Sequence, residues 1–128
     1  MNKVMKATDL MIGDWVLYGQ RFAIIKELYN GYVTILCSIN GQDEYIEETY
    51  DNIEPIPLTP EILEKNEFFK SYDDDGIHYK YTLISDGIGF SLKYVRSVFQ
   101  WLGPLDFKYV HELQHALKLC GIKKEIEL

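Results

Sequence analysis

The residues whose types and spacing could do chemistry lie late in the chain, where His111, Glu112 and His115 form the pattern His-Glu-x-x-His. On a helix, histidines at this spacing share a face and can bind one zinc ion, while the Glu takes a proton from metal-bound water. One hypothesis is therefore a minimal zinc-dependent hydrolase or peptidase, with His111 and His115 as metal ligands and Glu112 as the catalytic base.

Three features of the sequence count against that hypothesis. A catalytic zinc ion normally has a third protein ligand, but Gly121 stands where the extended motif has its third histidine. The chain is small for a substrate cleft, and His78 is expected on a hairpin rather than beside this helix. Apolar residues recur on the opposite side of the helix, so both histidines are expected to point away from the core. We therefore expect a solvated helix face with no catalytic residue, metal ligand or cofactor, and keep zinc as the alternative.

Two acidic clusters are weaker candidates for a site. Residues 73–76, Asp-Asp-Asp-Gly, resemble part of a calcium loop, but Thr82 would replace the Glu that ends such a loop. We expect a solvated turn between strands there. A second cluster could attract a cation or a basic partner, although the rim of a barrel is the more ordinary interpretation. It comprises Asp43, Glu44, Glu47, Glu48 and Asp51.

The first part of the chain predicts five short strands. Asn30-Gly31 and Asn40-Gly41 are preferred two-residue hairpin turns. The segments that flank them, 22–28 and 32–39, are rich in β-branched and aromatic residues, and shorter strands are expected near residues 15–17, 44–48 and 53–56. Strands so closely spaced favour a small barrel, because closure removes exposed edges. Residues 1–58 are the first predicted lobe.

The second part predicts a mixed lobe over residues 59–128. Thr59 and Pro60 begin a short helix, which Asn66 can end in the left-handed conformation. Residues 77–83 and 88–94 alternate around the Asp86-Gly87 turn and predict a hairpin with one buried face, which a strand over 95–101 extends. A helix over 107–120, capped by Asp106, and a final strand over 122–128 complete an α+β chain, in which the meander packs against the C-terminal helix.

Composition and charge limit the partners. The net charge is −7 and the sequence pI is about 4.9, which opposes binding to nucleic acid or to an anionic membrane surface. No apolar run is long enough to span a membrane, and the N-terminal segment lacks the apolar core of a signal peptide. Two distant cysteines, Cys37 and Cys120, indicate a reducing compartment. We expect a cytoplasmic protein.

Four segments of the chain resemble a group of short proteins of gut anaerobes and their phages or mobile elements. They are LMIGDW at residues 10–15, IEPIPLTPEILEKN at 53–66, KYVHELQ at 108–114 and EIEL at 125–128. No known activity comes with this resemblance. It implies that Glu112 and His115 vary to Gln and Asn among relatives, that His111 has a structural role, and that the first lobe is a barrel of the Src-homology-3 type.

The function that these observations favour is a non-enzymatic protein-interaction or accessory module of phage or mobile-element origin. Its loops and its many aromatic residues could hold a protein partner. The sequence leaves the identity of that partner and the oligomeric state open. It also leaves open how the two lobes pack.

Overall fold

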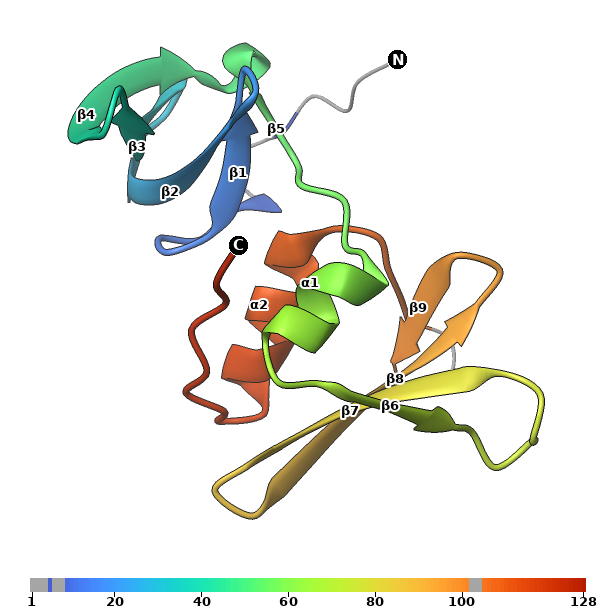
Figure 1. Ribbon diagram of the computed structural model, residues 1–128. Coiled ribbons are helices and arrows are strands. Elements are labelled where there is room, and N and C mark those ends of the chain that lie inside the picture. The colour runs from blue at the N-terminus through green and yellow to red at the C-terminus, as the bar shows by residue number, and fades with distance from the viewer. Residues whose placement is uncertain (1–4, 6–8, 102–104) are drawn as a thin grey trace. The chain divides into compact units, whose positions relative to one another are not determined.

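The protein divides into two compact units, Met1–Ile56 and Pro57–Leu128. The structure is a computed structural model that describes residue 5 and residues 9–101 and 105–128 (Figure 1). Each unit is built on a five-stranded antiparallel sheet. In these described residues, ten strands in two sheets and a C-terminal helix confirm the α+β class that the sequence predicts. No helix in the described part of the chain is long and apolar enough to cross a membrane.

The first unit contains the five strands that the sequence predicts. They are β1 (Trp15–Tyr18), β2 (Arg21–Leu28), β3 (Tyr32–Ile39), β4 (Gln42–Thr49) and β5 (Ile53–Glu54), with a 3₁₀ turn, η2 (Tyr50–Asn52), before β5. The order across the sheet is β4-β3-β2-β1-β5. Each hairpin pairs neighbours in the chain, and β5 returns to pair with β1. Strand β4 therefore lies at one edge of this sheet.

The two predicted Asn-Gly turns of this unit differ. Asn40 and Gly41 have φ values of 52° and 80°, so both central residues are left-handed, as a tight two-residue hairpin requires. At the other turn only Gly31 has a positive φ, and Tyr29 N donates to Tyr32 O across 3.0 Å. Tyr29 and Tyr32 therefore flank Asn30-Gly31 as predicted, but Asn30 does not adopt the positive φ expected at both central residues.

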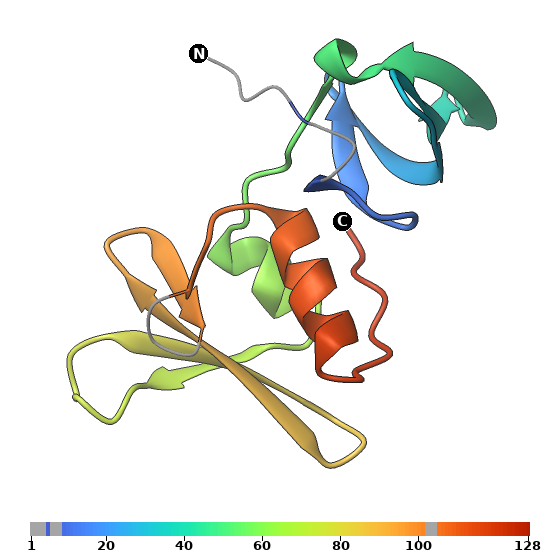
Figure 2. The same ribbon diagram turned by 180° about the vertical axis from the view of Figure 1, so that it is seen from behind.

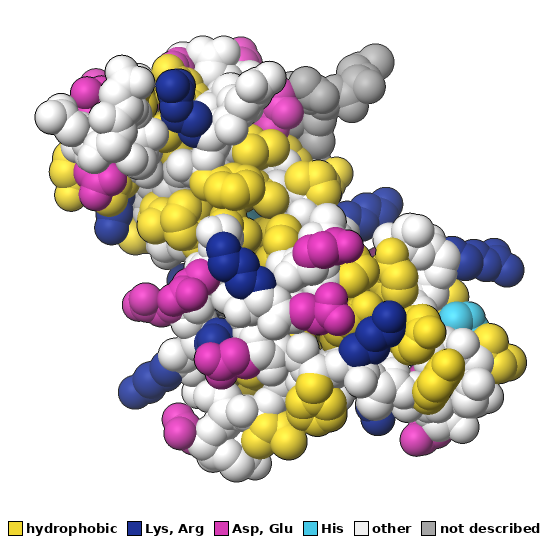
Figure 3. All heavy atoms as spheres, in the orientation of Figure 1, with side chains coloured by type: hydrophobic (Ala, Val, Ile, Leu, Met, Phe, Trp, Pro, Cys, Tyr) yellow, Lys and Arg dark blue, Asp and Glu magenta, His cyan; other side chains and the backbone are white. Residues whose placement is uncertain are grey.

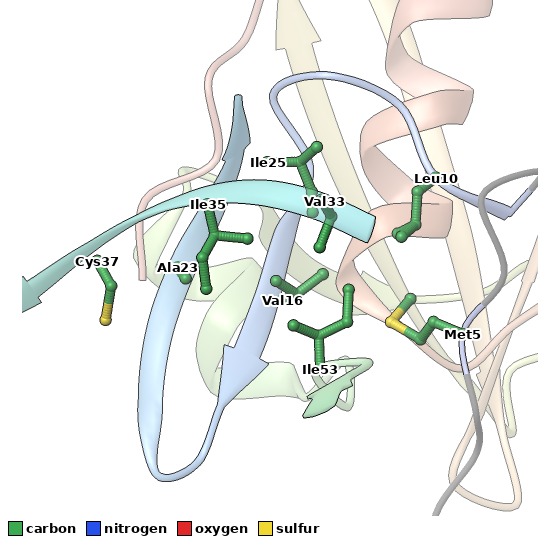
Figure 4. Packing of buried hydrophobic residues seen from close by; sticks show 9 residues of the cluster. All are labelled: Met5, Leu10, Val16, Ala23, Ile25, Val33, Ile35, Cys37 and Ile53. Carbon is green, nitrogen blue, oxygen red and sulfur yellow. The ribbon is translucent and has the colours of Figure 1, made fainter. Parts of the chain in front are cut away.

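Hydrophobic side chains from four strands and the preceding segment form the core of the first unit (Figure 4). Alternate residues of β2 and β3 face inward, which is why the core draws on every second position of these strands. Burying such a side chain contributes roughly 1.5–3 kcal/mol. The buried residues are Met5, Leu10, Val16, Ala23, Ile25, Val33, Ile35, Cys37 and Ile53.

The second unit places two helices on one side of its sheet (Figures 1 and 2). Its elements are α1 (Pro60–Lys65), β6 (Phe69–Tyr72), β7 (Tyr79–Ser85), β8 (Ile88–Val95), β9 (Val98–Trp101), β10 (Leu105–Phe107) and α2 (Val110–Leu119). The sheet order is β10-β9-β8-β7-β6. The predicted hairpin and its third strand are the centre of this meander, to which β6 and β10 add edges that the sequence analysis missed.

The predicted alternation is confirmed at the centre of the hairpin, whereas Ile77, Tyr79 and Ile88 at its ends are exposed. Tyr81 and Leu83 of β7 and Phe90 and Leu92 of β8 are all buried. The Tyr81 ring meets the edge of Phe99 at 5.9 Å between centroids, which extends the aromatic core into β9. Such edge-to-face pairs stabilise a core beyond the area that they bury. The helix side of the sheet is therefore the buried side.

The ends of the helices differ in part from prediction. Thr59 caps α1 as expected, with its hydroxyl accepting from Ile62 N at 3.3 Å. Asp106 does not cap α2, because it lies in β10, whose pairing with β9 keeps the backbone extended as far as Phe107. Tyr109 is the N-cap instead, so α2 covers residues 110–119 rather than 107–120.

The C-terminal segment is not the strand predicted over residues 122–128. Figure 2 shows the chain turning back after α2, and the buried side chain of Asn66 holds its end. The Asn66 amide accepts from Glu127 N at 2.7 Å and donates to Glu127 O at 2.8 Å. A side chain thus replaces a neighbouring strand as the hydrogen-bonding partner. Asn66 itself is not left-handed (φ −99°), because Glu67 takes the positive φ of 71°.

Candidate functional site

The two histidines of the His-Glu-x-x-His pattern lie on α2 but do not both face solvent. His111 is only 3% exposed, and His115 is half-buried. The ring of His111 stacks on Tyr109 and meets the edge of the His115 ring at 5.6 Å between centroids. The prediction that both point away from the core is wrong for His111. The buried side of α2 includes His111 in addition to the apolar residues Val110, Leu113 and Leu117.

Glu112 has a structural partner. Its Oε1 atom accepts from the backbone N–H groups of Lys108 and Tyr109, each at 2.9 Å. These donors belong to the N-cap residue of α2 and the residue before it, whose N–H groups have no partner within the helix. The carboxylate also lies at the positive end of the helix dipole. In this arrangement Glu112 stabilises the start of the helix.

The described residues bring no third ligand to the histidine pair. Among them, no three His, Cys, Asp or Glu side chains come close enough together to hold a metal ion. His78 belongs to a different cluster: its Nδ1 lies 2.7 Å from Asp75 Oδ2, in the loop before β7. Within the described part of the chain, a catalytic zinc site would thus have only His111 and His115 as ligands, whereas it normally requires three. The Glu between them caps the helix.

The acidic loop before β7 is the solvated turn that the sequence predicts, and Asp73 and Asp75 in it are paired. Lys93 Nζ lies 2.9 Å from Asp75 Oδ2 and 3.4 Å from Asp73 Oδ2. Asp75 Oδ1 also accepts from the backbone N–H groups of Ile77 and His78. The His78 hydrogen bonds and those of Lys93 and Ile77 hold the pKa of Asp75 well below its usual range. The ion pair between Asp75 and Lys93 thus links the loop to β8.

The acidic strand β4 differs from this loop. Among the residues that the structure describes, β4 pairs only with β3, in unbroken register from Tyr32↔Thr49 to Ile39↔Gln42. The side chains of Asp43, Glu44 and Glu47 are exposed, and Tyr45 is 71% exposed. Figure 3 shows acidic side chains over this strand. The predicted exposure of these acidic side chains is confirmed. Their strand is in addition an unpaired edge of the sheet.

The hairpin geometry decides which backbone groups of β4 are open. In a two-residue hairpin the flanking residues, here Ile39 and Gln42, exchange both backbone hydrogen bonds, and bonded pairs then alternate. The N–H and C=O groups of Asp43, Tyr45 and Glu47 therefore point away from β3. Thr49 belongs to the same series, and its N–H donates to Glu48 Oε1 at 3.1 Å instead of to β3.

A small hollow lies at the end of β4. It has a volume of about 200 Å³ and is lined by Tyr32, Glu47, Glu48 and Thr49. The Tyr32 ring stacks on Tyr29 at 4.5 Å between centroids, and Tyr50 Oη donates to Tyr29 O at 2.7 Å. An aromatic wall beside two carboxylates is suited to a cationic side chain.

Glu48 is fixed and ionised at this hollow. Its Oε1 accepts from Asn52 Nδ2 at 2.6 Å, and this bond and the Thr49 N–H lower the pKa of Glu48. The hydrogen bond from the Tyr18 hydroxyl to Glu48, with the charge of that carboxylate, raises the pKa of Tyr18. The end of β4 therefore keeps its negative charge at neutral pH.

Comparisons with family models, with curated proteins and with solved structures find no match to this chain. The assignment of a site thus depends on the geometry of the chain itself. Sequence reasoning identified the acidic residues of β4 but not the open edge or the Tyr32 hollow. The signal available was the absence of any Lys or Arg between Lys26 and Lys65.

Proposed function

We propose that this protein is a non-enzymatic protein-interaction module, with an accessory role, and that its first unit binds a partner along β4. The observation that carries the proposal is an edge strand of eight residues with its outward backbone groups open and Tyr45 71% exposed. Open edges of this kind bind extended peptide segments by strand addition. The resemblance to proteins of phages and mobile elements supports an origin on such an element.

We assign the first unit to a small barrel of the Src-homology-3 type. The strand order β4-β3-β2-β1-β5 supports this assignment, as does the return of β5 to pair with β1 after a 3₁₀ turn. In a half-closed barrel of this kind, β4 and β5 are the two strands next to the gap. The proposal thus explains why so long a strand has an open edge.

The same proposal places the protein in the cytoplasm and excludes nucleic acid as its main partner. Two free thiols, Cys37 and Cys120, support a reducing compartment. The net charge of −7 opposes a polyanion. A protein segment is the partner class that remains.

An affinity capture with a matched variant tests the proposal. The immobilised chain is compared with Tyr45→Pro, and proteins retained in stoichiometric amounts are identified. We expect a partner that the wild-type chain retains and the variant loses. A partner retained equally by both would move the interaction to another surface, and a wild-type chain that retains no partner would contradict the proposal.

Metal content tests the zinc alternative directly. We expect elemental analysis of protein purified without chelator to find no stoichiometric zinc, because no three His, Cys, Asp or Glu side chains of the described residues come together beside His111 and His115. About one zinc ion per chain, lost in His111→Ala but retained in a surface control such as Lys118→Ala, would restore the hydrolase hypothesis.

A further inference from the structure

We infer that the segment bound at β4 is an extended chain in which two basic residues flank an apolar one at alternate positions. The inference rests on the proposed function and adds the chemistry of the partner. Its pattern is basic-x-apolar-x-basic.

The backbone fixes the register. The open N–H and C=O groups belong to Asp43, Tyr45 and Glu47, two residues apart, which is the spacing of the groups on one side of any β-strand. An added strand therefore places a residue directly opposite each of these three. The unbroken β3–β4 register leaves this edge without a bulge, and β4 contains no proline.

The side chains fix the pattern. Asp43, Tyr45 and Glu47 are alternate residues of β4. Because successive side chains of a strand point to opposite faces, these three side chains all lie on one face of the sheet. Directly opposite residues of paired strands interact on the same face, and opposite charges stabilise such pairs. The complement of acidic-aromatic-acidic is a basic residue, an apolar residue and a second basic residue.

The charge of this region favours a basic segment over a second copy of β4. From residue 27 to residue 56 the sequence has seven Asp and Glu and no Lys or Arg. Within the described chain, Asp43, Glu44 and Glu47 make no ion pair. A second copy of this strand would place carboxylates opposite carboxylates, which destabilises strand pairing. A basic segment would instead neutralise them.

The hollow at the end of β4 adds a specific contact. The partner residue opposite Glu47 lies beside the space of about 200 Å³ that Tyr32, Glu47, Glu48 and Thr49 line. A Lys or Arg stem fits a space of this size, with its charged end near the two carboxylates and its methylenes on the Tyr32 ring. The basic residue at this end of the pattern is therefore expected to contribute most to affinity.

Peptide titration of the full chain tests the inference. The probe is Thr-Thr-Lys-Thr-Val-Thr-Lys-Thr-Thr with blocked ends. One control replaces both Lys by Glu, and a second control, Thr-Thr-Thr-Lys-Lys-Thr-Val-Thr-Thr, keeps the composition but puts the two Lys on opposite faces. Binding is measured for the wild-type chain, for Glu47→Gln, for Tyr45→Pro and for Asp74→Asn, a matched acid in the loop before β7.

We expect the first peptide to bind with an affinity that falls with salt, and the two control peptides to bind at least about tenfold more weakly. Tyr45→Pro and Glu47→Gln should each weaken binding by about tenfold, and Asp74→Asn should leave it unchanged. Because Glu47→Gln is an exposed, isosteric change, its result does not depend on the fold tolerating proline.

Equal binding of the three peptides, or equal binding by wild type and both β4 variants, would overturn the inference. No binding of the first peptide by a chain that still captures its partner at β4 would also overturn it. In that case the proposed function stands with a partner of different chemistry. Failure of the proposed function is recognised separately, by a wild-type chain that captures no partner.

Discussion

Two groups of carboxylates in this protein have different surroundings. In the second unit, Asp75 pairs with Lys93 and His78, and Glu112 accepts two backbone N–H groups at the start of α2. In the first unit, Asp43, Glu44 and Glu47 are exposed on an edge strand, in a segment without Lys or Arg. The partnered carboxylates hold local structure together, whereas Asp43, Glu44 and Glu47 make no comparable contact with the residues that the structure describes.

The difference separates carboxylates that the fold uses from carboxylates that are available to a partner. Charged residues on an edge strand also keep it from pairing with copies of itself. That protective role is compatible with binding, because a strand that repels acidic edges still accepts a basic one. Mutations in the two groups should therefore affect different properties, stability in one and binding in the other.

The largest difference is expected between two adjacent proline substitutions in β4. Ile46→Pro removes an N–H group that bonds to β3 and should lower the free energy of unfolding by on the order of 3 kcal/mol. Tyr45→Pro removes an N–H group of the open edge and should cost less than about 1 kcal/mol. Urea unfolding followed by circular dichroism measures both, and equal losses would show that the Tyr45 N–H is not at an open edge.

Glu112→Ala should lower the free energy of unfolding by about 1 kcal/mol, because the backbone N–H groups of Lys108 and Tyr109 at the start of α2 lose their acceptor. Glu112→Gln is the matched control, since its amide oxygen can still accept and should restore part of the loss. The same urea unfolding experiment measures these variants. A Glu112→Ala protein as stable as the wild type would contradict the structural role of this carboxylate.

Asp75→Asn should lower the thermal midpoint slightly at neutral pH and change the pH dependence of stability. The pKa of Asp75 is lower in the folded protein than its ordinary value, so its contribution is present above that value and is lost as the pH falls through the folded pKa. The gap between wild type and variant should be constant above about pH 5 and shrink below about pH 4. Thermal unfolding over that range measures it; a gap that widens towards low pH would show the opposite sign.

The smallest effect on stability is expected for neutralising β4 itself. The triple variant Asp43→Asn, Glu44→Gln, Glu47→Gln should change the free energy of unfolding by no more than about 0.5 kcal/mol, since these side chains are exposed and repel one another. A loss of several kcal/mol would mean that these carboxylates have partners within the chain, and the contrast with Asp75 and Glu112 would fail.

Local signals in the sequence predict much of this fold. Asn40-Gly41 and Asp86-Gly87 specify two hairpins, and Thr59-Pro60 specifies the start of α1, because each effect arises within a few residues. The same holds for the alternation around Tyr81 and Leu83. The first unit's five strands follow from closely spaced turns and β-branched segments.

Features that depend on distant partners escape sequence analysis. The end of the chain is held by Asn66, which is 61 residues away from Glu127, so its alternation suggested a strand instead. The segments of β6 and β10 are extended because they pair with β7 and β9. The burial of His111 and the open edge of β4 are likewise set by which elements lie beside them, a property that periodicity does not encode.

Amide hydrogen exchange along β4 with and without the Lys-containing peptide tests the central claim most directly. The account predicts that the amides of Asp43, Tyr45 and Glu47 exchange quickly in the free protein and are selectively slowed by the peptide. The amides of Glu44 and Ile46 should be protected in both states, because they bond to β3. Slow exchange at Tyr45 in the free protein, or peptide-induced protection that leaves these three amides unchanged, would contradict the claim that β4 is an open edge for a basic strand.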